Sequence, residues 1–148
     1  MENNHKKIDR LPTMARLGIV FLTWRRHLQR QLLPFNITLK QQFVLRQLER
    51  QEVLNPAEIA DMLFCDRPTA SVIINNLEKS GWVKRQKDPD NRKFILIQLT
   101  PKGKEKLKQL EQLPSDNLDP LNGLSSNEKC QLEELLIKLQ DYLDRHIP

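Results

Sequence analysis

Residue types that build catalytic and covalent sites are scarce in this chain of 148 residues. It has two cysteines, Cys65 and Cys130, and three histidines, and their spacing matches neither a disulfide framework nor a metal site. A phosphate-binding loop, a carboxylate pair and a nucleophile–base pair are also missing at recognisable spacing. We therefore expect no enzyme activity, no metal and no cofactor.

Long hydrophobic runs are absent as well. The patch Ile19-Val20-Phe21-Leu22 is flanked by arginines and is much shorter than the roughly 20 residues of a membrane span. It also lacks the length and the cleavage site of a signal peptide. We expect a soluble, cytoplasmic protein with no membrane partner.

Positive charge is present in excess, but only in part of the chain, whose net charge is +5. Residues 1–35 carry seven basic against two acidic residues, residues 36–110 fourteen against nine, and residues 111–148 three against eight. A basic centre favours a polyanionic partner such as nucleic acid. The alternative is that 29% charged residues only keep the protein in solution.

Residues 55–81 predict two short helices joined by a tight turn. Asn55-Pro56-Ala57-Glu58 has the composition of a helix start, and Asp66-Arg67-Pro68-Thr69 starts a second helix that Ser80-Gly81 ends. The apolar residues of the second helix share one face, and they are Ala70, Ile73, Ile74 and Leu77. This pattern predicts a helix-turn-helix, whose second helix enters the major groove of DNA.

A β-hairpin is predicted directly after these helices. Residues 82–85 and 94–99 have the composition of strands, and the polar stretch between them contains a proline and several turn formers. Thr100-Pro101 then starts another helix. The predicted fold is therefore mainly α with a small β-hairpin wing, a winged helix-turn-helix.

Five sequence blocks, in this order, resemble the MarR-type transcriptional regulators. They are Thr38-Leu-Lys-Gln-Gln-Phe-Val-Leu, Pro56-Ala-Glu-Ile-Ala, Asp66-Arg-Pro-Thr-Ala-Ser, Leu77-Glu-Lys-Ser-Gly-Trp-Val, and Asp88-Pro-Asp-Asn-Arg-Lys leading to Leu99-Thr-Pro-Lys-Gly. The resemblance is strongest between Thr38 and Gly103. It implies a regulator that binds double-stranded DNA as a homodimer, with the first and last helices of two subunits intertwined.

Both ends of the chain carry an apolar helical seam that fits this arrangement. The first is Met14, Leu17, Phe21, Trp24 and Leu28, and the second is Leu132, Leu136, Leu139 and Leu143. Each seam packs either on its own domain or on a second copy of the chain. The resemblance implies the second alternative, with a dimerisation helix in residues 1–35, a DNA-binding lobe in 36–100 and C-terminal helices in 101–148 that complete the dimer interface.

The remaining segments are predicted from local patterns. Thr38 caps a helix that braces the helix-turn-helix, and Pro101 begins a helix that extends to about Leu113. The lysines of that helix, Lys102, Lys104, Lys106 and Lys108, are interpreted as a solvated face, with contact to phosphate as the alternative. The prolines at 114 and 120 predict a loop or a broken helix, and Ser125 or Ser126 caps the last helix.

The predicted recognition helix offers polar groups to DNA. Thr69 and Ser71 lie in its first turn, near amides that attract phosphate, and Arg67 can bind either a phosphate or a guanine. Asn75 can pair with adenine, and Asn76 lies beside it. Val72 stands where many family members carry arginine, which predicts weaker or different readout there. The candidate contacts are Arg67, Pro68, Thr69, Ser71, Val72, Asn75 and Asn76.

The predicted wing supplies the second set of contacts, which are Lys84, Arg85, Lys87, Asn91, Arg92 and Lys93. A thin hairpin tip can enter the minor groove, where arginine suits the negative potential. The family has an Asp-X-Arg pattern here, and alignment from Leu99 places Asn91 and Lys93 at its two ends. A shift of one residue restores the pattern as Asp90-Asn91-Arg92, so the inserted cation is either Arg92 or Lys93.

The resemblance also implies a small aromatic or lipophilic effector, bound between the dimer helices and the DNA-binding lobe. Phe21, Trp24 and Phe43 line such a pocket or belong to the ordinary core, which is the interpretation that we favour. We interpret Cys65 as a buried core thiol.

We predict a transcriptional regulator, more specifically a repressor, that binds a pseudo-palindromic operator. One recognition helix would occupy each half-site, about one DNA turn apart. The alternative is a winged-helix protein-interaction module that has lost specific DNA binding. The departures from the family pattern at Val72 and Asn91 motivate that alternative.

Overall fold

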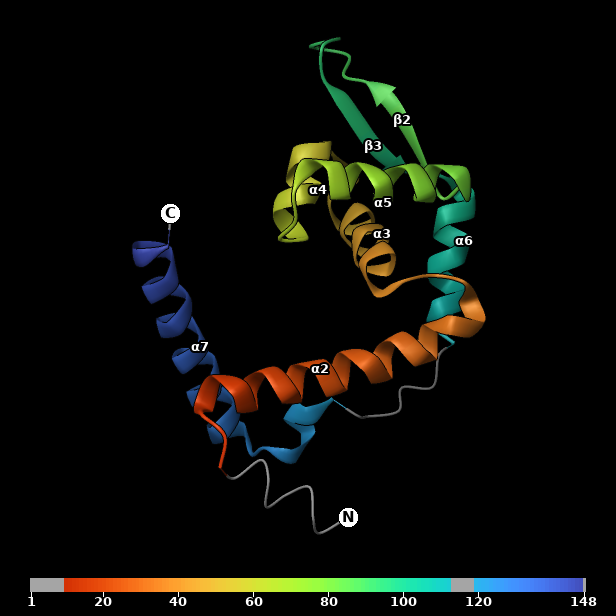
Figure 1. Cartoon of the computed structure of the whole chain (residues 1–148). Coiled ribbons are helices and arrows are strands. Elements are labelled where there is room, and N and C mark those ends of the chain that lie inside the picture. The colour runs from red at the N-terminus through yellow and green to blue at the C-terminus, as the bar shows by residue number, and fades with distance from the viewer. Residues whose placement is uncertain (1–9, 113–118, 148) are drawn as a thin grey trace. The chain divides into compact units, whose positions relative to one another are not determined.

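The computed structural model describes residues 10–112 and 119–147 (Figure 1). Its elements are α2 (Thr13–Leu32), η1 (Leu33–Phe35), α3 (Leu39–Gln51), β1 (Val53–Leu54), α4 (Pro56–Met62), α5 (Arg67–Lys79), β2 (Val83–Lys87), β3 (Ile95–Leu99), α6 (Pro101–Leu110), η2 (Pro120–Gly123) and α7 (Ser126–His146). The predicted fold class, mainly helical with a hairpin wing, is confirmed. The chain divides into two compact units, residues 27–114 and residues 1–26 with 115–148.

The predicted helix starts are confirmed because each is set by a local cap. Thr38, Asn55 and Ser125 each form a capping box, in which the cap side chain accepts from the third helical N–H and the third side chain reaches back. Asp66 and Thr100 cap α5 and α6 with side-chain oxygens. These five caps determine where α3, α4, α5, α6 and α7 begin.

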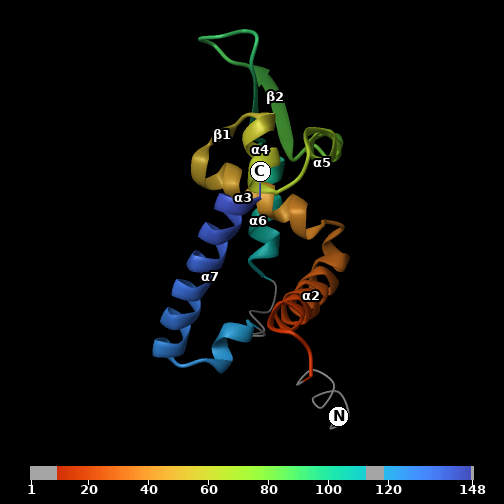
Figure 2. The ribbon, with the colours of Figure 1, turned by 60° about the vertical axis from the view of Figure 1, so that its left-hand side comes forward.

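The sheet has three antiparallel strands in the order β1-β3-β2. The predicted hairpin of β2 and β3 is present and projects beyond the helices of its unit (Figure 1, Figure 2). The third strand, β1, was not predicted, because it consists of two residues between the end of α3 and Asn55. Val53 pairs with Gln98, and Leu54 pairs with Ile97, so β1 anchors the base of the wing.

One hydrophobic core holds the helix-turn-helix and the wing together. α3 packs on α5, α6 and β3, and α4 packs on α5. The buried residues of α5 are Ala70, Ile74 and Leu77, as predicted, whereas Ile73 is half-buried. The rest of the core is Leu32, Ile37, Val44, Leu45, Leu48, Leu54, Ile59, Ala60, Trp82, Val83, Ile97, Leu107 and Leu110. All of these residues belong to the unit of residues 27–114.

A tight junction joins the end of α5 to the start of α6. Gly81 has a φ of +74°, a left-handed conformation that glycine adopts without steric cost. The hydroxyl of Thr100 donates to the carbonyl oxygen of Gly81 at 2.5 Å. A Cβ at Gly103 would lie 2.1 Å from the carbonyl oxygen of Trp82, so α6 can approach the start of the wing only with glycine at this position.

α6 differs from its prediction in two respects. It ends at Leu110, whereas Leu113 lies outside the described residues. Its lysines do not form a uniformly solvated face, because Lys106 donates to the carbonyl oxygen of Phe35 at 2.5 Å. The ammonium also lies 4.9 Å from the centroid of the Trp82 ring, and burial lowers the pKa of Lys106. Lys106 therefore joins α6 to η1.

The predicted apolar seams of the terminal helices are largely exposed, and only Trp24, Leu28 and Leu132 among their residues are half-buried. None of the residues of α7 is buried, and Leu136, Leu139 and Leu143 are each between 42% and 45% exposed. In α2, Met14 and Phe21 are also exposed. Among residues 119–123, the predicted break is a single 3-10 turn, and residue 114 lies outside the described residues. Over the described ranges, no helix is long and apolar enough to cross a membrane.

Candidate nucleic-acid interface

The face of α5 opposite its buried side is exposed. The apolar face of α5 packs into the core through Ala70, Ile74 and Leu77, so the polar residues of the helix point away from the core. Val72 is 58% exposed and leaves an apolar side chain on this surface. The exposed set contains every residue predicted for the recognition helix, namely Arg67, Pro68, Thr69, Ser71, Val72, Asn75 and Asn76.

In the first turn of α5, few backbone N–H groups are left free to bind a phosphate. The N–H of Thr69 donates to the carboxylate of Asp66 at 2.7 Å, and Pro68 has no N–H. Hydrogen bonds from the hydroxyl and the N–H of Thr69, and to a lesser degree the charge of Lys40, hold the pKa of Asp66 below its usual value. Attraction of phosphate at this end therefore rests on side chains such as Arg67 more than on helix amides.

Arg85 connects the wing to the recognition helix. Its Nη1 forms an ion pair with Oε2 of Glu78 at 2.7 Å, and its Nη2 donates to Oδ1 of Asn75 at 2.5 Å. The motifs of the sequence predict separate DNA contacts for Arg85 and Asn75 and assign no role to Glu78. The signal was present, since Asn75 and Glu78 lie one turn apart on a helix that a tight turn connects to β2.

The wing tip is shaped by short-range hydrogen bonds. Oδ1 of Asn91 accepts from the N–H of Lys93 at 3.2 Å, and the N–H of Phe94 donates to the carbonyl oxygen of Asn91 at 2.9 Å. Asn91 thus acts as a turn-forming residue. Within the described ranges, Arg92 and Lys93 have no side-chain ion pair or hydrogen bond, and the Asp90–Arg92 pair of the shifted alignment is not formed.

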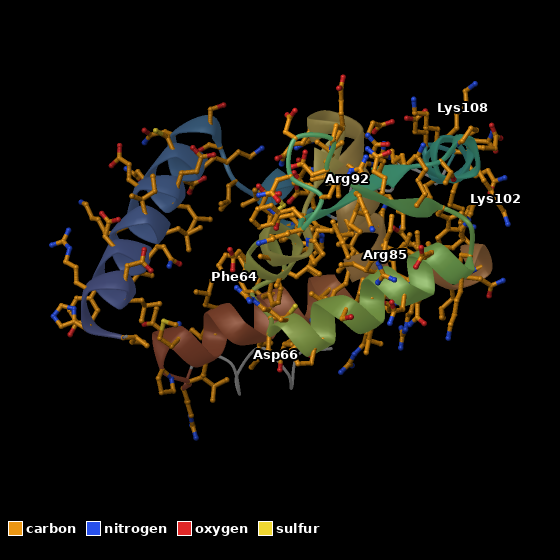
Figure 3. The ribbon with its side chains drawn as sticks, turned by 90° about the horizontal axis from the view of Figure 1, so that it is seen from above. Phe64, Asp66, Arg85, Arg92, Lys102 and Lys108 are labelled. Atoms are coloured by element: carbon orange, nitrogen blue, oxygen red, sulfur yellow. The ribbon has the colours of Figure 1, made fainter. Side chains whose placement is uncertain are left out.

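The unpaired cations extend from the start of α5 to the wing tip. Arg67 begins the helix, Lys84 and Lys87 lie on β2, and Arg92 and Lys93 occupy the tip, all of them exposed. Figure 3 shows this region from above, with Arg85 at α5 and Arg92 on the wing. Because Arg85 is neutralised by Glu78, the charge available to DNA resides mainly in the other cations.

The predicted pocket residues do not belong to the core of either unit. Phe21 and Trp24 contact each other edge to face, with ring centroids 6.4 Å apart, and Phe21 is 50% exposed. Phe43 of α3 is 40% exposed. The favoured assignment to an ordinary core is therefore wrong for Phe21 and Phe43, whereas Trp24 is half-buried. An effector pocket stays a prediction. Cys65, expected to be buried, is half-buried against the core.

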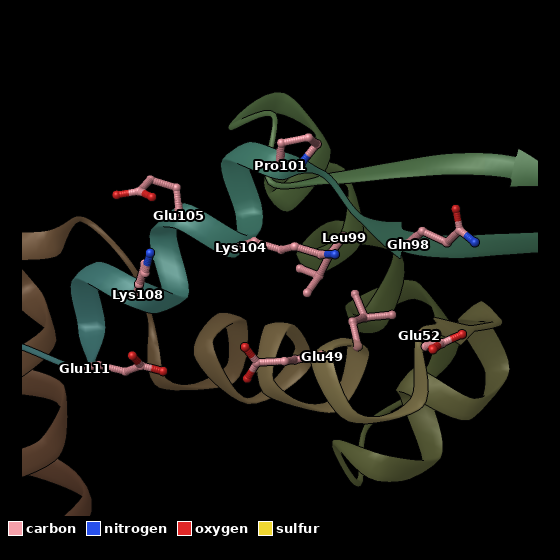
Figure 4. A pocket seen from close by; sticks show the side chains of 10 residues that line it. Glu49, Glu52, Gln98, Leu99, Pro101, Lys104, Glu105, Lys108 and Glu111 are labelled. Atoms are coloured by element: carbon pink, nitrogen blue, oxygen red, sulfur yellow. The ribbon is translucent and has the colours of Figure 1, made fainter.

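A groove of about 830 Å³ lies elsewhere, between the end of α3, β3 and α6 (Figure 4). Glu49 and Glu52 lie on its α3 side, and Lys104 and Lys108 come from α6. This charged lining does not suit a lipophilic ligand. A second groove, of about 420 Å³, lies beside Trp82 and Lys106. Neither groove contains the predicted aromatic residues.

Comparison with known proteins identifies the family. The family model described as "MarR family" matches residues 37–95, which span α3, the helix-turn-helix and most of the wing. The chain belongs to the MarR family. The matched segment contains every residue of the candidate interface described above.

Curated relatives and solved structures agree with this assignment to the MarR family. The transcriptional repressor MprA of Escherichia coli is 32% identical over 111 residues, which are 74% of this chain and 63% of MprA, so the match leaves more than a third of MprA uncovered. The multiple antibiotic resistance protein MarR of Salmonella typhimurium is 29% identical, over 77% of this chain and 81% of MarR. A crystal structure of a MarR mutant from Escherichia coli complexed with operator DNA has a TM-score of 0.78 at 27% identity, and the match covers 88% of this chain and 95% of that one.

Proposed function

We propose that this chain is a sequence-specific DNA-binding regulator of transcription, more specifically a repressor, that acts as a homodimer in the cytoplasm. The observation that carries the proposal is the surface formed by α5 and the wing, where exposed polar residues adjoin unpaired cations. The MarR relative crystallised with operator DNA supports the same assignment. The named relatives include a transcriptional repressor, and we propose no enzymatic activity.

In this proposal, α5 enters the major groove and the wing tip enters the adjacent minor groove. Arg67, Lys84 and Lys87 neutralise phosphates, which supplies most of the affinity. Thr69, Ser71, Asn75 and Asn76 face base edges, and Arg92 or Lys93 inserts into the minor groove. Occupation of a promoter then represses transcription by occlusion.

The exposed apolar seams of α2 and α7 support homodimer formation. Contiguous exposed apolar surface on a helix indicates an interface, because water contact with such a surface is unfavourable. We assign dimerisation to residues 1–35 and 101–148, and DNA binding to residues 36–100. The family resemblance supports a small aromatic or lipophilic effector as a further part of this proposal.

The test is a binding titration by fluorescence anisotropy. The full-length protein is titrated into a duplex from upstream of its own gene, with an unrelated duplex as competitor, over a series of salt concentrations. The proposal predicts competitor-resistant binding that weakens steeply as salt rises. Absence of binding to both duplexes at low salt would contradict it and would favour a protein-docking module.

A further inference from the structure

The guanidinium of Arg85 is held by two side chains of the recognition helix. Nη1 lies 2.7 Å from Oε2 of Glu78, and Nη2 lies 2.5 Å from Oδ1 of Asn75. Both bonds have a charged donor, which makes them stronger than bonds between neutral groups. The side chain of Arg85 is only 32% exposed, and that of Glu78 is 39% exposed. Arg85 is therefore part of the joint between β2 and α5.

This joint fixes the orientation of the Asn75 amide. A guanidinium offers only donors, so the oxygen of the amide must face Arg85 and the NH2 group must point elsewhere. Over the described residues, no hydrogen bond engages the NH2 group of Asn75, and the residue is exposed. Asn75 therefore presents two N–H donors to the groove, while a charged donor occupies one of the two lone pairs of its oxygen.

We propose that Arg85 is a positioning residue that sets base preference through Asn75 without itself contacting DNA. The inference rests on the proposed function. In bidentate pairing of asparagine with adenine, the amide oxygen accepts from N6 and the amide nitrogen donates to N7. Arg85 places a charged donor on one lone pair of the oxygen and turns the NH2 group toward the groove. Asn75 therefore acts chiefly as a donor and selects a purine through its N7 acceptor.

The first experiment measures base preference at every operator position. The operator is located by footprinting on the upstream duplex, and each base pair is replaced in turn by the other three. The variants are Asn75→Ala, Arg85→Lys, Arg85→Ala and the double variant Asn75→Ala with Arg85→Ala. Arg85→Lys keeps the charge but loses the planar fork that reaches both partners.

We expect Asn75→Ala and both Arg85 variants to lose discrimination at the same position of each half-site. The loss should be roughly three- to tenfold, as for one hydrogen bond, and the double variant should lose no more than Asn75→Ala alone. The salt dependence of Arg85→Lys should match that of the wild type. Uniform weakening on all sequences, with a shallower salt dependence in Arg85→Ala, would identify a phosphate contact and overturn the inference.

A second experiment tests the donor role directly, at the position that Asn75 selects. Replacing a purine there by its 7-deaza analogue removes the N7 acceptor and should weaken wild-type binding but not binding by Asn75→Ala. Replacing an adenine there by purine removes only the 6-amino group and should leave wild-type affinity unchanged. If loss of the amino group weakens the wild type but not Asn75→Ala, the amide oxygen pairs with the base and the inference is wrong.

Two controls separate this inference from folding and from the proposed function. Lys84→Ala, at the neighbouring residue of β2, should weaken binding equally on all sequences and reduce the salt dependence. Thermal unfolding of each variant excludes a folding defect, and Glu78→Gln, which keeps an acceptor for Arg85, should retain base preference. If the wild type binds no site, the proposed function itself is wrong. If the wild type is specific and Arg85→Ala keeps the same base preference, only the role of Arg85 is wrong.

Discussion

Three residues support the DNA-binding surface without being candidate DNA contacts themselves. They are Asp66, Gly81 and Gly103. Asp66 accepts from Thr69 and fixes the first turn of α5. Gly81 provides the left-handed residue that ends the same helix region, and Gly103 lets α6 lie against the backbone of Trp82. The orientation of the recognition helix therefore depends on single positions at both of its ends, which can be tested one at a time.

The cap formed by Asp66 should make stability depend on pH. Since hydrogen bonding to Thr69 lowers the pKa of Asp66 in the folded state, the cap stabilises the fold above the pKa of the unfolded chain and is lost as the pH falls through the folded value. We expect Asp66→Ala to lower the melting temperature at pH 7, by an amount that shrinks below about pH 4. Thermal unfolding from neutral to acidic pH measures this, with Asp66→Asn as a cap that does not titrate. A deficit of constant size across the acidic range would contradict the prediction.

The packing of Gly103 reverses the usual effect of an alanine. In a helix, Gly→Ala normally stabilises by about 0.5–1 kcal/mol. At Gly103 the new Cβ would lie 2.1 Å from the carbonyl oxygen of Trp82, so we expect Gly103→Ala to destabilise by roughly 1–3 kcal/mol. Gly18→Ala in α2 is the matched control. The Cβ added there would meet no atom within 4 Å, so this variant should not be destabilised. Urea unfolding measures whether each alanine raises or lowers the free energy of unfolding. An unchanged midpoint for Gly103→Ala would show that α6 can shift away from the Trp82 carbonyl.

Elements whose signals are local were predictable, and elements that depend on distant contacts were not. Asn55 and Thr38 start helices because a cap and its partner lie three residues apart in the sequence. β1 has only two residues and exists because β3 pairs with it more than forty positions later. Its sequence carries no period that could reveal it.

The candidate site shows the same division. The exposed face of α5 follows from helical periodicity, because Ala70, Ile74 and Leu77 identify the buried side. The contacts of Arg85 with α5, and of Lys106 with Phe35, depend on how strands and helices pack. A cation in a sequence is therefore easily assigned to solvent or DNA when its partner is a side chain or a carbonyl oxygen of another element.

The wing should contribute to binding through its two unpaired tip cations. We expect Arg92→Ala with Lys93→Ala to weaken binding to the specific duplex and to reduce the slope of log affinity against log salt by roughly one to two. Arg50→Ala with Lys138→Ala removes the same charge from exposed positions on α3 and α7 and serves as the control. Anisotropy over a salt series measures both variants. Unchanged affinity in the wing variant would show that the tip does not enter the minor groove.

At the scale of the whole chain, charge and apolar surface are separated along the sequence. The surplus of positive charge lies before residue 111, whereas α7 lies within the segment with a surplus of negative charge. An acidic segment is repelled by DNA, and its exposed leucines suit a protein partner. This separation agrees with a protein that contacts DNA through its centre and a second subunit through its terminal helices.

Disruption of the α7 seam should therefore produce a monomer. The wild type is expected to have twice the chain mass of 17.5 kDa in light scattering. Leu139→Glu places a charge in the seam and should yield the mass of one chain, with weaker operator binding. Gln131→Glu adds the same charge at another exposed position of α7 and should remain dimeric. A wild type that is monomeric at micromolar concentration would remove the model of paired half-sites.

Two recognition helices, one from each subunit, should bind one operator, and footprinting shows whether they do. The upstream duplex is bound by the wild-type protein, and protection is mapped in the major groove by guanine N7 methylation and along the backbone by hydroxyl radicals. We predict two related half-sites whose centres lie roughly 10 base pairs apart, each flanked by a protected minor groove. Protection of a single half-site, or of no defined site, would contradict the account.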